Sequence, residues 1–313
     1  MFLDHDLRLL YGGILVLLAI ASIAGAVLAR TVTSESGRAT VANLNARVRA
    51  WWWMCFVFAI AIATGGFASV ILFGLVSFLA LREFLTLTPT RLSDHHALFW
   101  TFFVFAPIQY GLVAIGWYGL FSVLIPVYAF LFIPTRIVLE GDTTAFLERA
   151  AKIQWGLMIC VYCVSHAPAL LMLEIPGFEM QNAKLLFFLV LVVQASDVLQ
   201  YLFGKTLGRR PIAPTVSPNK TWEGFAGGVL AATALGASLW WVTPFSPLAA
   251  AGMSLAITLM GFAGGLTMSA IKRDRGVKDF GRMIEGHGGI MDRIDSVCFS
   301  APVFFHLTRY FYT

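Results

Sequence analysis

Charged residues are scarce in this sequence. Lys, Arg, Asp and Glu make up only 12% of its 313 residues, whereas hydrophobic residues make up 58%. A typical soluble domain carries about 25% charged residues, so this chain has too little polar surface to cover a globule in water. The same numbers exclude a disordered chain, which needs low hydrophobicity and high net charge. The composition therefore predicts an all-α, polytopic integral membrane protein.

Cysteine is also scarce, with only four residues in the chain. All four lie in apolar segments, which argues against a disulfide framework. Cys160 and Cys163 have the C-x-x-C spacing, but their neighbours are Ile, Val and Tyr. A redox or metal site needs a polar environment around its thiols. We therefore interpret these cysteines as small, buried apolar residues.

Long apolar runs are abundant, and a helix needs about 20 apolar residues to cross a bilayer. The acidic start, Met-Phe-Leu-Asp-His-Asp, lacks the basic residues of a cleavable signal peptide, so we expect the first run to be retained. The segment 51–84 is interrupted only by Gly65 and Gly66 and could be two helices, a re-entrant hairpin or one helix. We expect nine or ten membrane elements, at 8–29, 51–64, 67–84, 97–114, 117–133, 153–173, 185–203, 224–242, 248–270 and 296–312.

The positive charges test this count independently. If all ten segments cross, 19 of the 22 Lys and Arg residues fall in loops on one side, at 30–50, 82–96, 134–152, 204–222 and 271–296. Cytoplasmic loops of membrane proteins are rich in Lys and Arg. The bias predicts ten crossings with both termini outside. It also explains the net charge of +5 without a nucleic-acid partner.

No loop exceeds about 30 residues, which is too short for an independent soluble domain. We therefore treat 1–313 as a single membrane domain. Its N-terminal helices (1–184) carry modest loops, whereas residues 185–313 contain two strongly polar stretches, 204–223 and 269–296. Polar residues between apolar spans mark the place to seek a functional site.

Asp197 lies inside the apolar span 185–203. A carboxylate there is costly unless it is paired, hydrated or bound to metal. It could pair with a Lys of the next loop or reach the membrane surface, but Asp is too short to reach far. We favour a functional role.

The first polar stretch contains Ser217-Pro218-Asn219, which is typical of a turn, directly before a predicted helix. Backbone N–H groups at that helix start, with Lys220 and the hydroxyls of Ser217 and Thr221, form a candidate phosphate cradle. The Walker pattern G-x-x-x-x-G-K is absent. The alternative is an ordinary loop whose cations reach the membrane surface and anchor the neighbouring helices there.

The second polar stretch holds six cations and five acids within 28 residues. Membrane anchoring needs only cations, so the carboxylates indicate a metal site beside phosphate-binding cations. Asp292 and Asp295 are three residues apart and share one helix face. Carboxylate oxygens favour Mg²⁺ over zinc. His287, flanked by glycines, could be a ligand, an acid or a phosphate donor, and the sequence leaves this open.

At these two stretches the sequence resembles the phosphatidate cytidylyltransferases, also called CDP-diacylglycerol synthases. The resemblance covers about residues 194–296 and includes the run from Ala213 to Gly224. Two departures, Glu285 in place of Pro and Val198-Leu199 after Asp197, put the lipid acceptor in doubt and fit a divergent paralogue. The signature of the family is matched at Ser269, Lys272, Arg273, Lys278, Asp279, Gly281, Ile284, His287, Gly288, Gly289, Asp292, Arg293 and Asp295.

The resemblance implies transfer of the cytidylyl group of CTP to phosphatidate, or to a similar lipid phosphate, for phospholipid biosynthesis. It implies a bacterial inner membrane, a cytoplasmic active site and one or two Mg²⁺ ions. Asp279 and Asp292 would be the leading ligands, and Asp197 and Asp295 further acids. Phosphates would be held by Lys220, Lys272, Arg273, Lys278 and Arg293, with Ser217, Thr221, Lys205, Gly288 and Gly289 binding substrate beside His287.

Two other functions stay open at this point. In a transporter, Asp197 would couple to an ion, but transporter sites lie near the midplane and often accompany inverted repeats, which are not visible here. A CTP-dependent polyprenol kinase would share the membrane setting but transfer the γ-phosphoryl group. Glycines such as Gly224 and Gly261 permit close helix contacts within or between subunits, so a homodimer also stays open.

Overall fold

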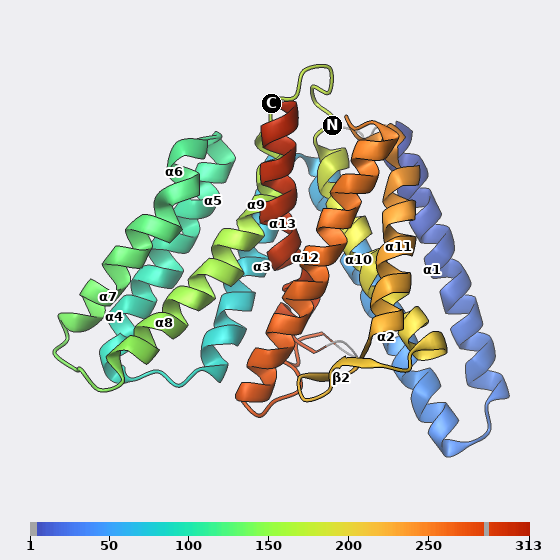
Figure 1. Ribbon diagram of the computed structural model, residues 1–313, viewed down its shortest axis with the longest axis horizontal. Coiled ribbons are helices and arrows are strands. Elements are labelled where there is room, and N and C mark those ends of the chain that lie inside the picture. Colours follow the sequence, from blue (N-terminus) through green and yellow to red (C-terminus); the bar gives the residue numbers. More distant parts are fainter. Residues whose placement is uncertain (1–4, 285–287) are drawn as a thin grey trace.

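The computed structural model describes residues 5–284 and 288–313 and shows a bundle of helices (Figure 1). In these residues, eight helical segments are long and apolar enough to cross a membrane. They are α1 (His5–Thr31), α2 (Glu35–Thr64), α3 (Gly66–Leu87), α4–α5 (Leu92–Ile115), α6–α7 (Tyr118–Val138), α8–α9 (Phe146–Met172), α10 (Ala183–Leu207) and α12 (Pro247–Asp274). The prediction of an all-α polytopic membrane protein is confirmed.

Two further helices complete the bundle. The helix α11 (Trp222–Ser238) packs against both α10 and α12, and α13 (Met291–Tyr312) packs against α12. Three of the longer segments contain a π-helical turn, at Thr101–Phe105, Leu124–Ala129 and Met158–Cys163. The ten predicted segments all correspond to helices, although α11 and α13 fall short of the length or hydropathy of the other eight.

The segment 51–84 is two helices. The helices α2 and α3 meet at Gly65, whose φ of +115° lies in the region that favours glycine. The predicted start of this element at residue 51 is wrong, because α2 begins at Glu35 after the N-cap Ser34, whose Oγ accepts a hydrogen bond from Gly37 N at 3.2 Å. Hydropathy detects only the apolar part of such a helix, whereas Ala, Leu and Arg also favour helix in its polar part.

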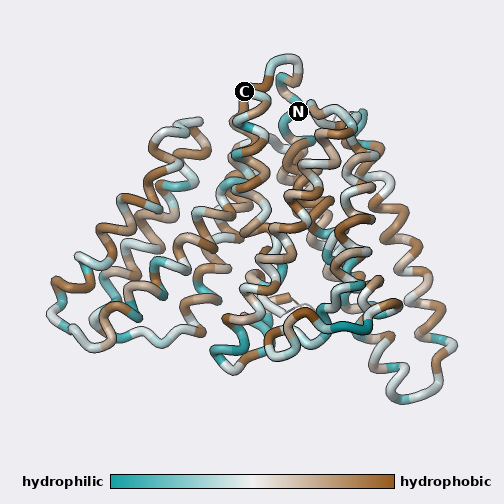
Figure 2. Tube along the Cα trace, viewed as in Figure 1, coloured by the Kyte–Doolittle hydropathy of each residue, from teal (hydrophilic) through white to brown (hydrophobic). Residues whose placement is uncertain are grey.

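The connections that follow α1, α3, α7, α10 and α12 lie at one end of the molecule, and the start of α1 and the end of α13 lie at the other (Figure 1). Figure 2 shows hydrophilic segments gathered at the first end, around β2. We call this the polar end. These connections, together with the adjoining ends of the helices, make up the five stretches that carry 19 of the 22 Lys and Arg residues.

A small antiparallel hairpin lies at the polar end. Its strands are β1 (Pro211–Ala213) and β2 (Ser217–Thr221), with Pro211 opposite Thr221 and Ala213 opposite Ser217. The predicted turn at Ser217-Pro218-Asn219 is therefore wrong, since these residues form a strand. Pro218 is compatible with it because each strand of a two-stranded sheet is an edge strand.

Part of the buried core lies where α10 packs against α13. Phe188 of α10 and Phe304 of α13 are fully buried, with ring centroids 5.9 Å apart. Cys160 is also buried, and its Sγ lies 3.8 Å from the Met291 sulfur. All four cysteines are free thiols; Cys160 and Cys298 are buried, whereas Cys55 and Cys163 are half-buried. This core fixes α10, α12 and α13, whose polar ends carry the candidate site.

Candidate active site

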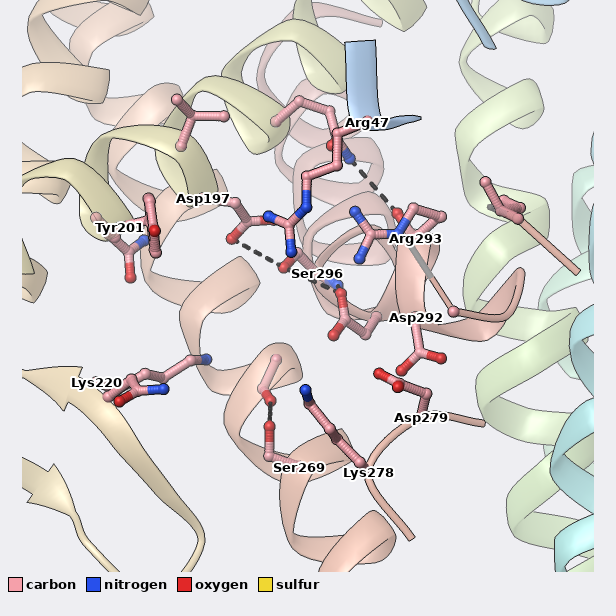
Figure 3. Close-up of a pocket in the computed structure, with 18 of the residues that line it drawn as sticks. Arg47, Asp197, Tyr201, Lys220, Ser269, Lys278, Asp279, Asp292, Arg293 and Ser296 are labelled. Carbon is pink, nitrogen blue, oxygen red and sulfur yellow. Dashed lines mark hydrogen bonds between the residues drawn. The ribbon is translucent and has the colours of Figure 1, made fainter. Parts of the chain in front are cut away.

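A cavity of about 760 Å³ opens at the polar end. Its walls come from α2, α10, β2, α12, the segment after α12 and the start of α13 (Figure 3). Nine of the predicted site residues line it: Asp197, Lys220, Thr221, Lys278, Asp279, Gly288, Asp292, Arg293 and Asp295. The fold thus brings the two polar stretches together around one cavity.

Two carboxylates lie on either side of Ser296. The Ser296 hydroxyl donates a hydrogen bond to Asp197 Oδ1 at 3.1 Å (Figure 3) and lies 3.5 Å from Asp295 Oδ1. The same Asp295 oxygen accepts a hydrogen bond from Ser296 N at 2.8 Å. We call Asp197 and Asp295 the serine-linked pair. In the described residues, the Oδ2 atom of each has no hydrogen bond or ion pair from the protein, so both oxygens are available to a ligand.

The other two carboxylates flank a glycine. Asp279 and Asp292 lie side by side in Figure 3, and we call them the loop pair. A Cβ atom on Gly288 would lie 2.8 Å from Asp292 Oδ2 and 3.1 Å from the Asp279 Cβ. Gly288 also has a φ of +82°, so glycine is required here for both space and conformation.

Asp292 differs from the other three acids because the protein itself satisfies both of its oxygens. Oδ1 accepts the Lys272 Nζ at 2.7 Å in an ion pair whose side chains are only 13% and 3% exposed. Oδ2 accepts the backbone N–H groups of Phe280 at 2.8 Å and Gly289 at 3.0 Å. Asp292 therefore holds the segment after α12 against the start of α13.

Five cations line the cavity: Arg47, Lys220, Lys278, Arg282 and Arg293. Within residues 5–284 and 288–313, none of the five forms an ion pair with a carboxylate. The Arg293 Nε atom is buried and has no hydrogen-bond partner there. Because an unpaired guanidinium N–H binds oxyanions strongly, the cavity is suited to a polyanionic ligand.

Lys220 reaches the cavity from β2. Its Nζ lies 4.8 Å from the centroid of the Phe262 ring, and a Cβ on Gly265 would come within 2.9 Å of it. Burial lowers the pKa of Lys220 below its ordinary value, although Asp197 and Asp295 act in the opposite direction. The neighbouring Thr221 accepts a hydrogen bond from Gly224 N at 3.1 Å and so caps α11.

Several predicted residues lie beside the cavity without lining it. Lys272 is engaged by Asp292, and Gly289 contributes its backbone N–H to the same acid. Ser217 is half-buried in β2. In the described structure these residues lie behind the cavity wall and support it, and they are not among the residues that line the cavity.

Two predicted cations also lie outside the cavity wall. Arg273 donates from Nε to the Val216 carbonyl at 3.2 Å, which ties α12 to the hairpin. Lys205 is exposed near the end of α10, with its Nζ 6.0 Å from the centroid of the Tyr201 ring. The prediction for His287 and the departure at Glu285 fall outside the described residues.

Sequence reasoning missed one wall of the cavity. Asn43, Arg47 and Trp51 of α2 line it and are spaced four residues apart, hence on one helix face. The interpretation of 30–50 as a loop hid this spacing. Other polar residues of the cavity wall were also missed, and they are Gln194, Gln200, Tyr201, Arg282 and Ser296.

The donor set fits a hard divalent cation. In the described residues, no group of three or more His, Cys, Asp or Glu side chains is arranged to hold a metal ion. Mg²⁺ rarely needs such a group, because it is commonly bound by one or two carboxylates together with substrate phosphates and water. The unengaged oxygens of the serine-linked pair match that requirement, beside cations that would hold the phosphates.

Comparison with known proteins agrees with this chemistry. A model of the "Cytidylyltransferase family" matches residues 45–311. The uncharacterized protein YnbB of Escherichia coli (strain K12) is 40% identical over 272 residues, which cover 86% of this chain and 88% of that protein. The phosphatidate cytidylyltransferase of Bacillus subtilis (strain 168) is 30% identical over 262 residues, covering 82% of this chain and 94% of that enzyme. The enzyme of the same name from Mycobacterium leprae (strain TN) is 42% identical over 127 residues, or 40% of this chain and 41% of that enzyme.

Proposed function

Since this chain belongs to the cytidylyltransferase family, we propose that it transfers the cytidylyl group of CTP to phosphatidate, forming CDP-diacylglycerol and pyrophosphate. The observation that carries this proposal is the cavity at the polar end, where five cations without ion pairs in the described residues face four carboxylates. A membrane helix bundle with such a cavity lets a lipid headgroup meet a nucleotide from the aqueous side.

The reaction is an in-line displacement at phosphorus. A phosphate oxygen of the lipid attacks the α-phosphorus of CTP, a new P–O bond forms, and the bond from that phosphorus to the bridging oxygen of pyrophosphate breaks. The attacking phosphate is already ionised at neutral pH, so no strong general base is needed. Catalysis then rests on positioning and on stabilising negative charge.

The cavity residues divide these tasks. Arg293 and Lys220 hold phosphate oxygens near the serine-linked pair, and Lys278 approaches from the opposite wall (Figure 3). Asp197 and Asp295, with Asp279, would hold Mg²⁺. The cation, when bound, neutralises charge on the transferring phosphoryl and the leaving pyrophosphate. Asp292 keeps this geometry through its bonds to Lys272 and the adjacent backbone.

We assign the lipid headgroup to the wall formed by α2 and α10. Arg47 of α2 provides a guanidinium for the acceptor phosphate. Val198 and Tyr201 of α10 are 48% and 59% exposed and offer apolar surface next to Asp197. Val198 belongs to one of the two departures from the family pattern, so the alternative acceptor is another lipid phosphate.

The proposal extends to topology. The polar end carries the Lys- and Arg-rich loops, so we place it on the cytoplasmic side of a bacterial inner membrane with both termini outside. That orientation gives CTP direct access to the cavity.

The product made from CTP labelled at the α-phosphorus tests the proposal. Purified protein is incubated with labelled CTP, Mg²⁺ and vesicles that contain phosphatidate or another lipid phosphate. Label in the extracted lipid is expected, and the lipid that gives the fastest transfer identifies the acceptor. Label in released CDP would instead indicate a lipid kinase, and no transfer to any lipid phosphate would favour transport.

A further inference from the structure

Glu83 is an acid buried in an apolar helix. It and Arg82 are the only charged residues of α3, and Glu83 is 9% exposed. In the described part of the chain it has no ion-pair partner. A buried carboxylate without compensation is strongly unfavourable, so other groups must stabilise it.

That compensation comes from the start of α13. Glu83 Oε1 accepts the N–H of Ile290 at 3.0 Å, and Oε2 accepts the N–H of Met291 at 2.9 Å, 208 residues along the chain. The α13 N-cap, Ile290, provides no side-chain cap of its own. The first N–H groups of a helix lack intrahelical partners and carry the positive end of its dipole. Glu83 therefore caps α13 from a helix in the other half of the protein.

The backbone around Glu83 is shaped to admit it. A Cβ on Gly281 would lie 2.5 Å from Glu83 Oε1, and a Cβ on Gly289 would lie 2.3 Å from Oε2. Next to this contact, Phe84 stacks on Phe280 with ring centroids 6.3 Å apart. The two glycines, which lie between Asp279 and Asp292 in the sequence, thus allow the backbone to approach the Glu83 carboxylate closely.

The same segment carries the reacting groups. Met291, whose N–H bonds to Glu83, immediately precedes Asp292. Asp292 in turn accepts a hydrogen bond from the N–H of Gly289. Arg293 and Asp295 follow within the first turns of α13. Glu83 itself does not line the cavity. Glu83 contacts the start of α13, which carries Asp292, Arg293 and Asp295, but Glu83 does not reach the space that a ligand would occupy.

We propose that Glu83 is a positioning residue, which anchors the start of α13 so that Asp292, Arg293 and Asp295 face the transferring phosphorus. This inference rests on the proposed function, because it assigns Glu83 a role in the same reaction. Loss of a group that orients residues in direct contact with a metal or substrate typically lowers activity by about 10- to 100-fold. The loss should appear in kcat, with KM values for both substrates close to wild-type.

The test combines kinetics with hydrogen exchange on the full-length protein. In Glu83→Ala, the amides of Ile290 and Met291 should exchange faster, whereas exchange in α11 stays unchanged, and kcat should fall. Glu83→Gln keeps one acceptor oxygen, so its amide exchange and its kcat should change in the same direction but by less. If the Ala variant fails to fold, the Gln variant is used in its place. The matched control is Asp94→Asn, because Asp94 is also buried but pairs with Arg149 at 3.1 Å, away from the cavity. This control should leave kcat and the exchange at residues 290–291 unchanged.

Three results would overturn the role of Glu83. They are wild-type kcat in Glu83→Ala, wild-type exchange at residues 290–291, and accelerated exchange spread over all helices, which would indicate general destabilisation. Failure of the proposed function is distinguishable from these. It appears as the absence of CDP-lipid product with wild-type protein, whereas the exchange measurement needs no activity.

Discussion

The four carboxylates of the cavity face the same space, but the protein engages Asp292 of the loop pair and leaves the serine-linked pair partly open. Asp292 of the loop pair receives Lys272 on one oxygen and two backbone N–H groups on the other. The serine-linked pair, Asp197 and Asp295, has an unengaged Oδ2 on each acid in the described residues. A carboxylate that the protein already satisfies organises structure, whereas one left open is free to serve a ligand. This contrast leads us to rank the serine-linked pair above Asp292 as ligands for Mg²⁺.

The largest effect is expected at the serine-linked pair. Asp295→Asn should lower kcat/KM by about 10³-fold, the size of loss found when one preorganised electrostatic group is removed from a reaction centre. Thermal stability should change little, because Ser296 N still has an amide oxygen to bond. Steady-state assays and thermal unfolding in detergent measure the two quantities. Asp279→Asn should behave in the same way, and wild-type turnover by either variant would contradict the metal assignment.

Asp292→Asn should damage both activity and stability. The substitution leaves Lys272 half-buried without its partner, and breaking a buried ion pair on one side typically costs about 3–5 kcal/mol. The double variant Asp292→Asn/Lys272→Met should recover much of the free energy of unfolding while activity stays low. A fully stable Asp292→Asn protein would remove the distinction between the two pairs.

How much of this site the sequence predicts can be judged from particular residues. Asp197, Asp279, Asp292, Asp295 and Arg293 stand out because polar residues between apolar spans need a reason to be there, and all five line the cavity. Their contacts with the rest of the chain could not be predicted. Lys272 stands 20 residues from Asp292, and only the packing of α12 on α13 shows that it is paired.

Residues supplied by the N-terminal helices were harder to find. The sequence places Arg47 in a basic loop, where it is expected to anchor the membrane surface. In the structure α2 extends back to Glu35, and Arg47 on this helix lines the cavity. Glu83 follows Arg82 in an otherwise apolar run, and its partners are 207 and 208 residues away. Periodicity and local motifs report on neighbours in the chain, so contacts of this range are invisible to them.

A smaller effect is expected on the wall assigned to the lipid. Arg47→Ala should raise the KM for the lipid phosphate by roughly 10-fold, consistent with the loss of one hydrogen bond to a charged group, and leave the KM for CTP unchanged. Arg38→Ala, on the same helix but outside the cavity, is the control. A rise in the KM for CTP alone would move Arg47 to the nucleotide side.

The smallest effect concerns pH. Burial lowers the pKa of Lys220, so its positive charge is present at low pH and is lost as pH rises through that pKa. As Lys220 loses its charge at high pH, its binding of phosphate should weaken. Arginine stays protonated at these pH values, so Lys220→Arg should shift the alkaline limb of kcat/KM for CTP to higher pH. An unchanged limb would exclude Lys220 as the titrating group.

The stoichiometry of label transfer tests the central claim most directly. Purified wild-type protein is given Mg²⁺, phosphatidate vesicles and CTP labelled at the α-phosphorus. The label in the extracted lipid is counted, and the unlabelled pyrophosphate released is measured separately. We predict one labelled CDP-lipid for each pyrophosphate released, and formation of both products that is about 10³-fold slower with folded Asp295→Asn. Labelled CDP together with an unlabelled phosphorylated lipid, or equal transfer by Asp295→Asn, would contradict the account.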